Sequence, residues 1–263
     1  MSNLNILIVE GNNREDSQFF IKVAGASAAD NLKNLILKIE PLSNVKIINP
    51  SHDDETTNAL ENMNHYNGIV FTGGAMRLND MTDIIKKHIN FASNCFTKKK
   101  KILAICWGLQ VCSTAAGGKV NPGKNGAHIG IASDVIINND GQNHFIYKDK
   151  KKIFTSPAFN FDEVSELPKN AVLLSSDKIN NVMGVSFHVG NSEIIGLQYH
   201  PDYEYSQMLK LIAGRKERLF ANKNFLNDEE YENHISYIES ENELLSFNDR
   251  TCEVRNWLKY IKN

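Results

Sequence analysis

The chain has 263 residues, of which 41% are hydrophobic, 23% are charged and 9% are aromatic. This composition is typical of a globular protein and excludes a disordered or collagen-like chain. The 29 basic and 31 acidic residues give a formal net charge of −2, so the chain has no overall field that would attract nucleic acid or an anionic membrane. Apolar stretches such as 102–107 are far shorter than the roughly 18 residues that cross a bilayer, and the first residues lack a secretory pattern. We therefore expect a cytoplasmic protein without nucleic-acid or membrane partners.

The four cysteines are too few and too scattered for a disulfide framework. They are Cys95, Cys106, Cys112 and Cys252. None forms a C-x-x-C pair, and no group of cysteine and histidine has the spacing of a zinc site. The pattern predicts a reducing compartment and no metal centre, and it makes a free thiol available for chemistry.

The first two-thirds of the chain alternates short apolar runs with helical periodicity. The runs at 5–9, 68–71 and 102–105 are almost entirely apolar, as expected of buried strands, and 45–48 is a further predicted strand. Helices are predicted at 27–39, from a cap at Thr82 toward Lys98, and at 107–116. This alternation predicts an α/β fold with an open, mostly parallel sheet flanked by helices.

The pattern changes after residue 119. Short runs at 129–137, 153–156, 171–175, 183–189 and 193–198, separated by turn residues, predict antiparallel additions to the sheet. A helix is predicted at 203–213, and two charged helices near 228–238 and 252–261. We therefore expect a main domain over 1–213 and a helical C-terminal extension over 214–263 that packs on it.

The segment around Cys106 is the most informative part of the sequence. A buried strand ends at Cys106, and a helix starts immediately after it. A sulfur at such an elbow lies beside the helix N-terminus, whose free N–H groups and partial positive charge favour a thiolate and can bind an oxyanion. The alternative is that Cys106 is a small buried hydrophobic residue.

His200 is the candidate base for this thiol. It follows the run at 193–198, which would bring it to the carboxyl edge of the sheet where Cys106 lies. Asp202 and Glu204 are both close enough in sequence to orient the imidazole. The alternative for an isolated histidine before Pro201 is a plain turn residue.

A third segment completes the candidate site. The run at 68–71 leads directly into Thr72, Gly73 and Gly74, and glycines can present backbone N–H groups that a side chain would block. The N–H groups of Gly74 and Trp107 would together form a two-donor oxyanion hole. Taken alone, the glycine pair is more often an ordinary turn.

These three segments, in this order, resemble the class I glutamine amidotransferases, a flavodoxin-like Cys-His-Glu family. That family has an elbow G-x-C-x-G-x-Q, a Q-x-H-P-E segment and a Gly-Gly oxyanion loop, and the resemblance covers roughly 4–213, with the glutaminase domain of GMP synthase most similar. It implies a cysteine-dependent amide hydrolase or amidotransferase that uses a thioester intermediate and needs no metal or organic cofactor. The implied site has Cys106 as nucleophile, His200 as general base and acid, Asp202 in the place of the family's Glu with Glu204 as the alternative, Gly74 and Trp107 in the oxyanion hole, and Gly73, Gln110, Asn160 and Phe161 at the substrate.

The departures from the family pattern concern the substrate. Residues 159–161 read Phe-Asn-Phe where the family has Ser-His-Gly, which holds the amino-acid end of glutamine. The expected substrate is glutamine or a related γ-glutamyl amide, and this departure argues against free glutamine and in favour of an amide with a substituted nitrogen. Two forms remain open, a free-standing hydrolase and a glutaminase that serves a separate ammonia-accepting synthetase subunit. The alternative function is that of a catalytically inactive glutaminase-like regulatory or binding subunit.

Overall fold

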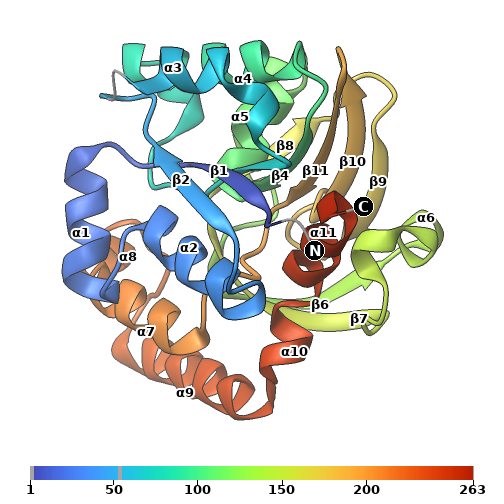
Figure 1. Cartoon of the computed structure of the whole chain (residues 1–263). Helices are drawn as coiled ribbons and strands as arrows, with labels where there is room; N and C mark the ends of the chain where they lie inside the picture. Colours follow the sequence, from blue (N-terminus) through green and yellow to red (C-terminus); the bar gives the residue numbers. More distant parts are fainter. Residues whose placement is uncertain (1–2, 53–54, 263) are drawn as a thin grey trace.

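A computed structural model describes residues 3–52 and 55–262, in which an open nine-stranded sheet is flanked by helices (Figure 1). The strand order is β2-β1-β3-β4-β11-β10-β9-β6-β7, and a separate small sheet pairs β5 with β8. The strands are β1 (Asn5–Val9), β2 (Asn44–Ile48), β3 (Gly68–Phe71), β4 (Lys101–Ile105), β5 (Lys119–Pro122), β6 (His128–Ile137), β7 (Ile153–Asn160), β8 (Asp162–Glu166), β9 (Val172–Ser176), β10 (Gly184–Val189) and β11 (Ser192–Leu197).

The helices lie on both faces of the sheet and along its lower edge in the view of Figure 1. The α-helices are α1 (Arg14–Ala24), α2 (Ala28–Ile39), α3 (Glu55–Glu61), α4 (Asp83–Phe96), α5 (Trp107–Ala115), α6 (Asn139–Asn143), α7 (Tyr205–Ala213), α8 (Lys216–Ala221), α9 (Asp228–Leu244), α10 (Phe247–Arg250) and α11 (Cys252–Lys262). Three short 3-10 helices are η1 (Met63–His65), η2 (Leu78–Asp80) and η3 (Phe145–Tyr147). None of the described helices is long and apolar enough to cross a membrane.

Five neighbouring strands, β2, β1, β3, β4 and β11, run parallel. Their apolar side chains alternate between two cores, because successive residues of a strand point to opposite faces. Ile6 and Ile8 pack with α2 and α11, whereas Leu7 and Val9 pack with α4 and α5. Burial on both faces explains the uninterrupted apolar runs in the sequence. The predicted α/β fold with a mostly parallel, helix-flanked sheet is confirmed.

The other half of the sheet is antiparallel, but its boundary differs from the prediction. The run at 193–198 was expected to be an antiparallel addition, yet β11 pairs in parallel with β4 and antiparallel with β10. Strand β11 therefore joins the two halves. The predicted helix at 203–213 begins at Tyr205, because Glu204 has extended backbone angles and its N–H is hydrogen-bonded to the Gln207 side chain at 3.0 Å.

Residues after 213 form helices α8 to α11, and α11 reaches the parallel half of the sheet. Trp257 is 1% exposed, and a Cβ built on Gly68 would lie 2.7 Å from its ring, so this strand needs a glycine to accept the helix. Lys262 forms an ion pair with Glu40 at the end of α2, with 2.8 Å between Nζ and Oε2. The domain boundary at residue 213 stays a prediction.

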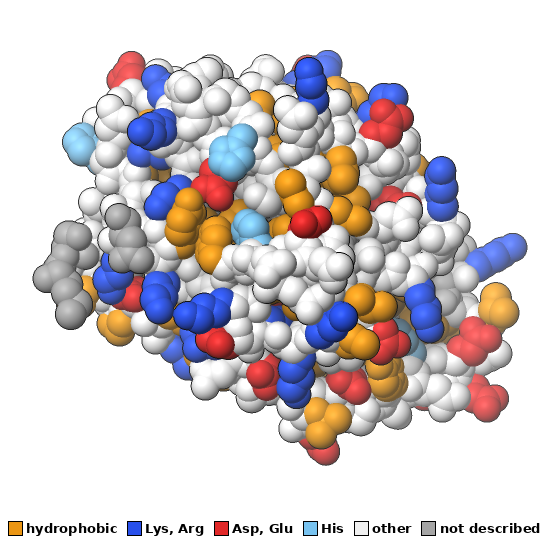
Figure 2. Space-filling view, turned by 90° about the vertical axis from the view of Figure 1, so that its right-hand side faces the viewer, with side chains coloured by type: hydrophobic (Ala, Val, Ile, Leu, Met, Phe, Trp, Pro, Cys, Tyr) orange, Lys and Arg blue, Asp and Glu red, His pale blue; other side chains and the backbone are white. Residues whose placement is uncertain are grey.

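On the face in Figure 2, basic and acidic side chains are interspersed among small hydrophobic groups.

Candidate active site

Cys106 lies at the elbow between β4 and α5. Its backbone has φ 50° and ψ −108°, a conformation rare for a residue with a side chain. Two contacts hold it there. The Cys106 N–H donates to the carbonyl of Leu197 at 2.7 Å, and a Cβ on Gly108 would lie 2.5 Å from the Phe71 carbonyl, so α5 crosses very close to β3. The neighbouring ladders of the sheet thus fix the position of the sulfur.

His200 follows β11 and lies at the same edge of the sheet as Cys106. Its Nδ1 is 3.0 Å from Oδ1 of Asp202, and both residues are buried. Glu204 points elsewhere, because its carboxylate is 55% exposed and pairs with Arg250 at 3.2 Å. Of the two carboxylates that the sequence offered, Asp202 therefore contacts the imidazole and Glu204 does not.

The surroundings of His200 favour its protonated form. Burial by itself lowers the pKa of His200, but the charges of Asp202 and Cys106 and hydrogen bonds to both residues outweigh burial. The net result raises the pKa of His200 from its ordinary value to about 10. At neutral pH the imidazole is therefore a cation.

Two buried glutamine amides form a chain that ends at the sulfur. Gln110 Nε2 lies 3.3 Å from Oε1 of Gln198, and Gln198 Nε2 donates to the Cys106 Sγ at 3.4 Å. Gln110 also donates to the carbonyl of Asp162 at 2.9 Å. Gln198 was not among the predicted site residues, although its place two residues before His200 was a usable signal. Its amide is a hydrogen-bond donor directed at the sulfur.

The two glycines after β3 lie where a side chain would not fit. A Cβ on Gly73 would be 2.5 Å from Cε1 of His200, and a Cβ on Gly74 would be 2.5 Å from the carbonyl of Gly11. Trp107 is the first residue of α5, and the N–H groups of a first turn have no acceptor within their own helix. The segment after β3 and the start of α5 therefore both place backbone groups at the edge of the sheet where Cys106 lies.

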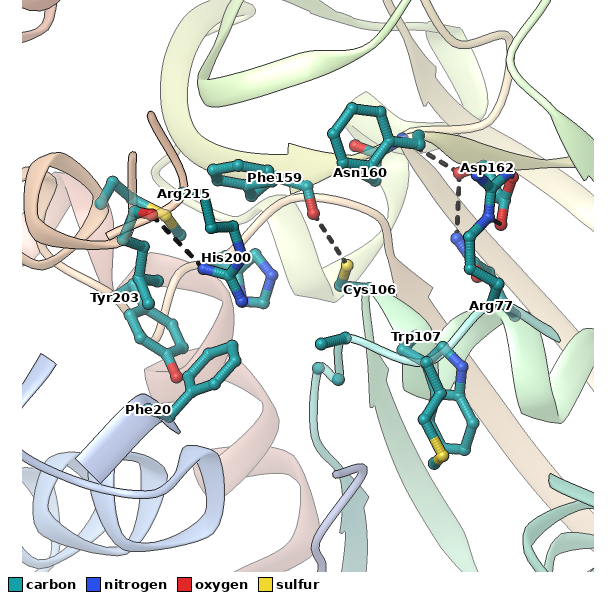
Figure 3. Close-up of a pocket in the computed structure, with 18 of the residues that line it drawn as sticks. Phe20, Arg77, Cys106, Trp107, Phe159, Asn160, Asp162, His200, Tyr203 and Arg215 are labelled. Carbon is teal, nitrogen blue, oxygen red and sulfur yellow. Dashed lines mark hydrogen bonds and ion pairs between the residues drawn. The ribbon is translucent and has the colours of Figure 1, made fainter. Parts of the chain in front are cut away.

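These residues line one pocket, shown in Figure 3. Its walls include eight of the predicted site residues, namely Gly73, Gly74, Cys106, Trp107, Gln110, Asn160, Phe161 and His200. Asp202 is not in the lining, since it contacts Nδ1 of the imidazole from behind. Among the residues that the structure describes, no group of histidine, cysteine and acidic side chains could hold a metal ion.

Asn160 and Arg77 are both engaged by protein partners at the pocket wall. The Asn160 amide donates to the carbonyl of Asp162 at 3.0 Å, and its oxygen lies 3.0 Å from Nδ1 of His128. Arg77 forms a two-pronged ion pair with the Asp162 carboxylate, with Nε 3.0 Å from Oδ2. Sequence reasoning missed this pair, because its members are far apart in the chain. The predicted contact of Asn160 with substrate stays a prediction.

The C-terminal extension holds the residues on both sides of His200. Arg250 is 6% exposed, and its Nη1 donates to the carbonyl of Pro201 at 3.0 Å. Tyr199 donates to Oε1 of Glu253 at 2.7 Å, and Glu253 in turn pairs with the buried Lys150 at 3.0 Å. No sequence motif indicated these contacts. These contacts, made by residues of α10 and α11, fix the position of the segment that carries the imidazole.

The family model described as glutamine amidotransferase class-I matches residues 24–214, which is most of the chain. The chain belongs to this family. It is therefore an enzyme of the cysteine-dependent amide hydrolase and amidotransferase type, as the elbow and the histidine segment indicated.

Curated relatives fall into two groups. A Pseudomonas protein named gamma-glutamyl-L-1-hydroxyisopropylamide hydrolase is 26% identical, over 99% of this chain and 94% of its own length. Gamma-glutamyl peptidase 3 of Arabidopsis thaliana is 29% identical over 57% of this chain and 60% of its own length. In the second group, a glutamine-hydrolysing GMP synthase protein of Methanococcus vannielii is 31% identical over 55% of this chain and 69% of its own length.

Solved structures share the fold. A glutamine amidotransferase from Thermotoga maritima superposes with a TM-score of 0.69 at 17% identity, and 99% of each chain is covered. A GMP synthase homologue from Thermoplasma acidophilum gives 0.57 at 18% identity, over 85% of this chain and 99% of that one. The fold therefore extends through the C-terminal part of this chain in the first of these structures.

Proposed function

We propose that the protein is a free-standing hydrolase of γ-glutamyl amides with Cys106 as its nucleophile. The sulfur attacks the amide carbonyl, and the C–N bond breaks as His200 gives a proton to the departing nitrogen. A thioester and a free amine, or ammonia, result. His200 then takes a proton from water, whose oxygen attacks the thioester, and the C–S bond breaks to release glutamate. Asp202 keeps the imidazole oriented through both steps.

Backbone donors hold the oxyanion of each tetrahedral intermediate in this proposal. The N–H groups of Gly74 and Trp107 are suited to this role, because both are main-chain groups at the pocket wall beside Cys106. Gly73 leaves room for the imidazole next to them. Gln110, Asn160 and Phe161 would contact the γ-glutamyl group.

The relatives support a substituted amide rather than an ammonia relay. The relative that matches nearly the whole chain is named as a hydrolase of a γ-glutamyl amide. The GMP synthase subunits, whose names imply a partner synthetase, match little more than half of the chain. A synthetase partner in trans is the second candidate. All four cysteines are free, which supports a cytoplasmic location.

The observation that carries the proposal is the strained elbow at Cys106 beside the His200–Asp202 pair. The test is release of amine or ammonia from glutamine and N-substituted γ-glutamyl amides by the wild type, Cys106→Ala and the matched control Cys112→Ala. We expect Cys106→Ala to fold and to lose activity, and Cys112→Ala to keep it. Wild-type rates in Cys106→Ala would refute the mechanism. Glutamine hydrolysis that appears only with added cell extract would favour the synthetase partner.

A further inference from the structure

The pocket has two chemically different halves on either side of Cys106 (Figure 3). One half, here the polar lobe, contains Asn160, Asp162 and Arg77, together with Gln110. The other half, here the apolar lobe, lies on the His200 side and is lined by Phe20, Phe159, Tyr203, Met208, Leu211 and Leu219. If the leaving group were ammonia, the side chains of the apolar lobe would contact no part of the substrate.

The apolar lobe adjoins the imidazole directly. The ring of Tyr203 meets that of His200 edge-on, with centroids 5.1 Å apart and an angle of 87°. Phe20 of α1 meets Tyr203 at 6.4 Å and 71°. Helices α7 and α8 close the lobe with aliphatic side chains. Such a wall stabilises bound hydrocarbon or aromatic groups.

Arg215 places a cation at the same lobe. Its guanidinium carbon is 4.5 Å from the ring centroid of Phe19, 5.2 Å from that of Phe20 and 5.4 Å from that of Phe159. Nη1 lies 3.5 Å from the carbonyl of Leu211. None of the ion pairs found among the described residues involves Arg215, although the carboxylate of Asp16 is close enough for its charge to act on the guanidinium. The N–H donors that Arg215 does not direct at the Leu211 carbonyl can still bind the carboxylate of a ligand.

The proton transfer from His200 decides which part of the substrate each lobe binds. His200 protonates the departing nitrogen in the proposed function, so the amine and its substituent lie on the His200 side of the sulfur. The γ-glutamyl group, which is polar at both ends of its chain, then lies on the other side. The apolar lobe therefore receives whatever is attached to the amide nitrogen.

We propose that the apolar lobe is a leaving-group subsite for an amine that carries a large apolar side chain and a carboxylate, and that Arg215 binds this carboxylate. The preferred substrates are then γ-glutamyl dipeptides with an aromatic or large aliphatic second residue. The inference rests on the proposed function. Arginine is suited to the role because a guanidinium can bind a carboxylate through two parallel hydrogen bonds.

Three substrates separate the contributions of the two features. γ-Glutamyl-phenylalanine carries both the ring and the carboxylate, γ-glutamyl-phenethylamide carries the ring alone, and glutamine carries neither. For the wild type we expect kcat/KM to fall in this order, with about tenfold or more between the first and the last. Arg215→Met keeps an apolar stem against the phenylalanine rings and removes the charge, so it should lower kcat/KM about tenfold for the dipeptide alone, mainly through KM. Arg218 also lines the pocket but is exposed, so Arg218→Met tests the competing cation, and we expect it to change each value less than threefold.

The outcomes are distinguishable from failure of the proposed function. If the wild type hydrolyses none of the three compounds, the proposed function fails. If it hydrolyses glutamine as fast as the dipeptide, the subsite is wrong and the function stands. If Arg215→Met weakens the dipeptide and the phenethylamide equally, or if Arg218→Met has the larger effect, the assignment of Arg215 is overturned. Thermal unfolding of both variants separates these effects from a loss of folded protein.

Discussion

Replacing Arg250 with methionine tests whether the C-terminal extension positions the imidazole. The substitution keeps an unbranched side chain and removes the donor that meets the Pro201 carbonyl at 3.0 Å. Pro201 is buried, and an unpaired buried carbonyl costs about 1–3 kcal/mol. The bond to Glu204 adds little, because that carboxylate is 55% exposed. We expect the free energy of unfolding to fall by about 2 kcal/mol, and the melting temperature by about 4–8 °C.

The catalytic effect should exceed what this stability loss explains. His200 directly precedes Pro201, and a displacement of a catalytic group by about 1 Å can cost on the order of 100-fold in rate. We expect kcat for γ-glutamyl amide hydrolysis to fall about 10- to 100-fold at a temperature where the variant is fully folded, with KM nearly unchanged. Steady-state kinetics and thermal unfolding on the same preparation measure both quantities.

Lys262→Met is the matched control. It removes another ion pair between the extension and the main sheet region, Lys262 with Glu40, which is partly exposed and remote from the histidine segment. This variant should lose little stability and no activity. Full kcat in Arg250→Met, or an equal loss of kcat in both variants, would refute the reasoning.

Three further substitutions test the site. Gly73→Ala places a Cβ 2.5 Å from Cε1 of His200 and should lower kcat/KM about 100-fold with a small change in melting temperature; an unchanged rate would contradict the contact. Asp202→Asn removes the charge that does most to raise the pKa of His200, so the alkaline limb of the pH–kcat/KM profile should move to lower pH, and an unmoved limb would contradict the pairing. His88 packs on Trp107, and burial lowers its pKa to about 3. Below pH 6.5 the unfolded chain therefore binds a proton at His88 that the folded protein does not. The free energy of unfolding of the wild type should then decrease by about 1.4 kcal/mol for each pH unit of acidification because of this group. His88→Phe should show a shallower loss between pH 6 and 4, and equal slopes in denaturant titrations would show that His88 is not responsible.

The parallel strands could be predicted because burial on both faces leaves uninterrupted apolar runs. The bounds predicted at 5–9 and 68–71 match β1 and β3. Helix α1 was missed, because its sequence is largely polar and buries just Phe20 and Ala24 among its described side chains. The direction of β11 was also wrong, since alternation and turn residues do not say which neighbour a strand pairs with.

The candidate site was predictable where one residue carries a local signal. Cys106 at a strand–helix junction and His200 after a strand are of this kind. Contacts made across the fold had no such signal, and the pairing of Arg77 with Asp162 and the support of Pro201 by Arg250 were found in the structure alone. The choice of Asp202 over Glu204 also needed coordinates, because both carboxylates can reach an imidazole two or four residues away.

The parallel pairing of β4 with β11 has a consequence for how the protein gains its reactivity. Ile105 is the ladder partner of Leu197, and Cys106 and Gln198 are 92 positions apart in the chain. Closing so long a segment is slow, since its entropy is lost before the contacts reward it. Partly folded molecules and nascent chains therefore hold the thiol without its activating partners, and recovery of activity during refolding should trail the recovery of helical signal.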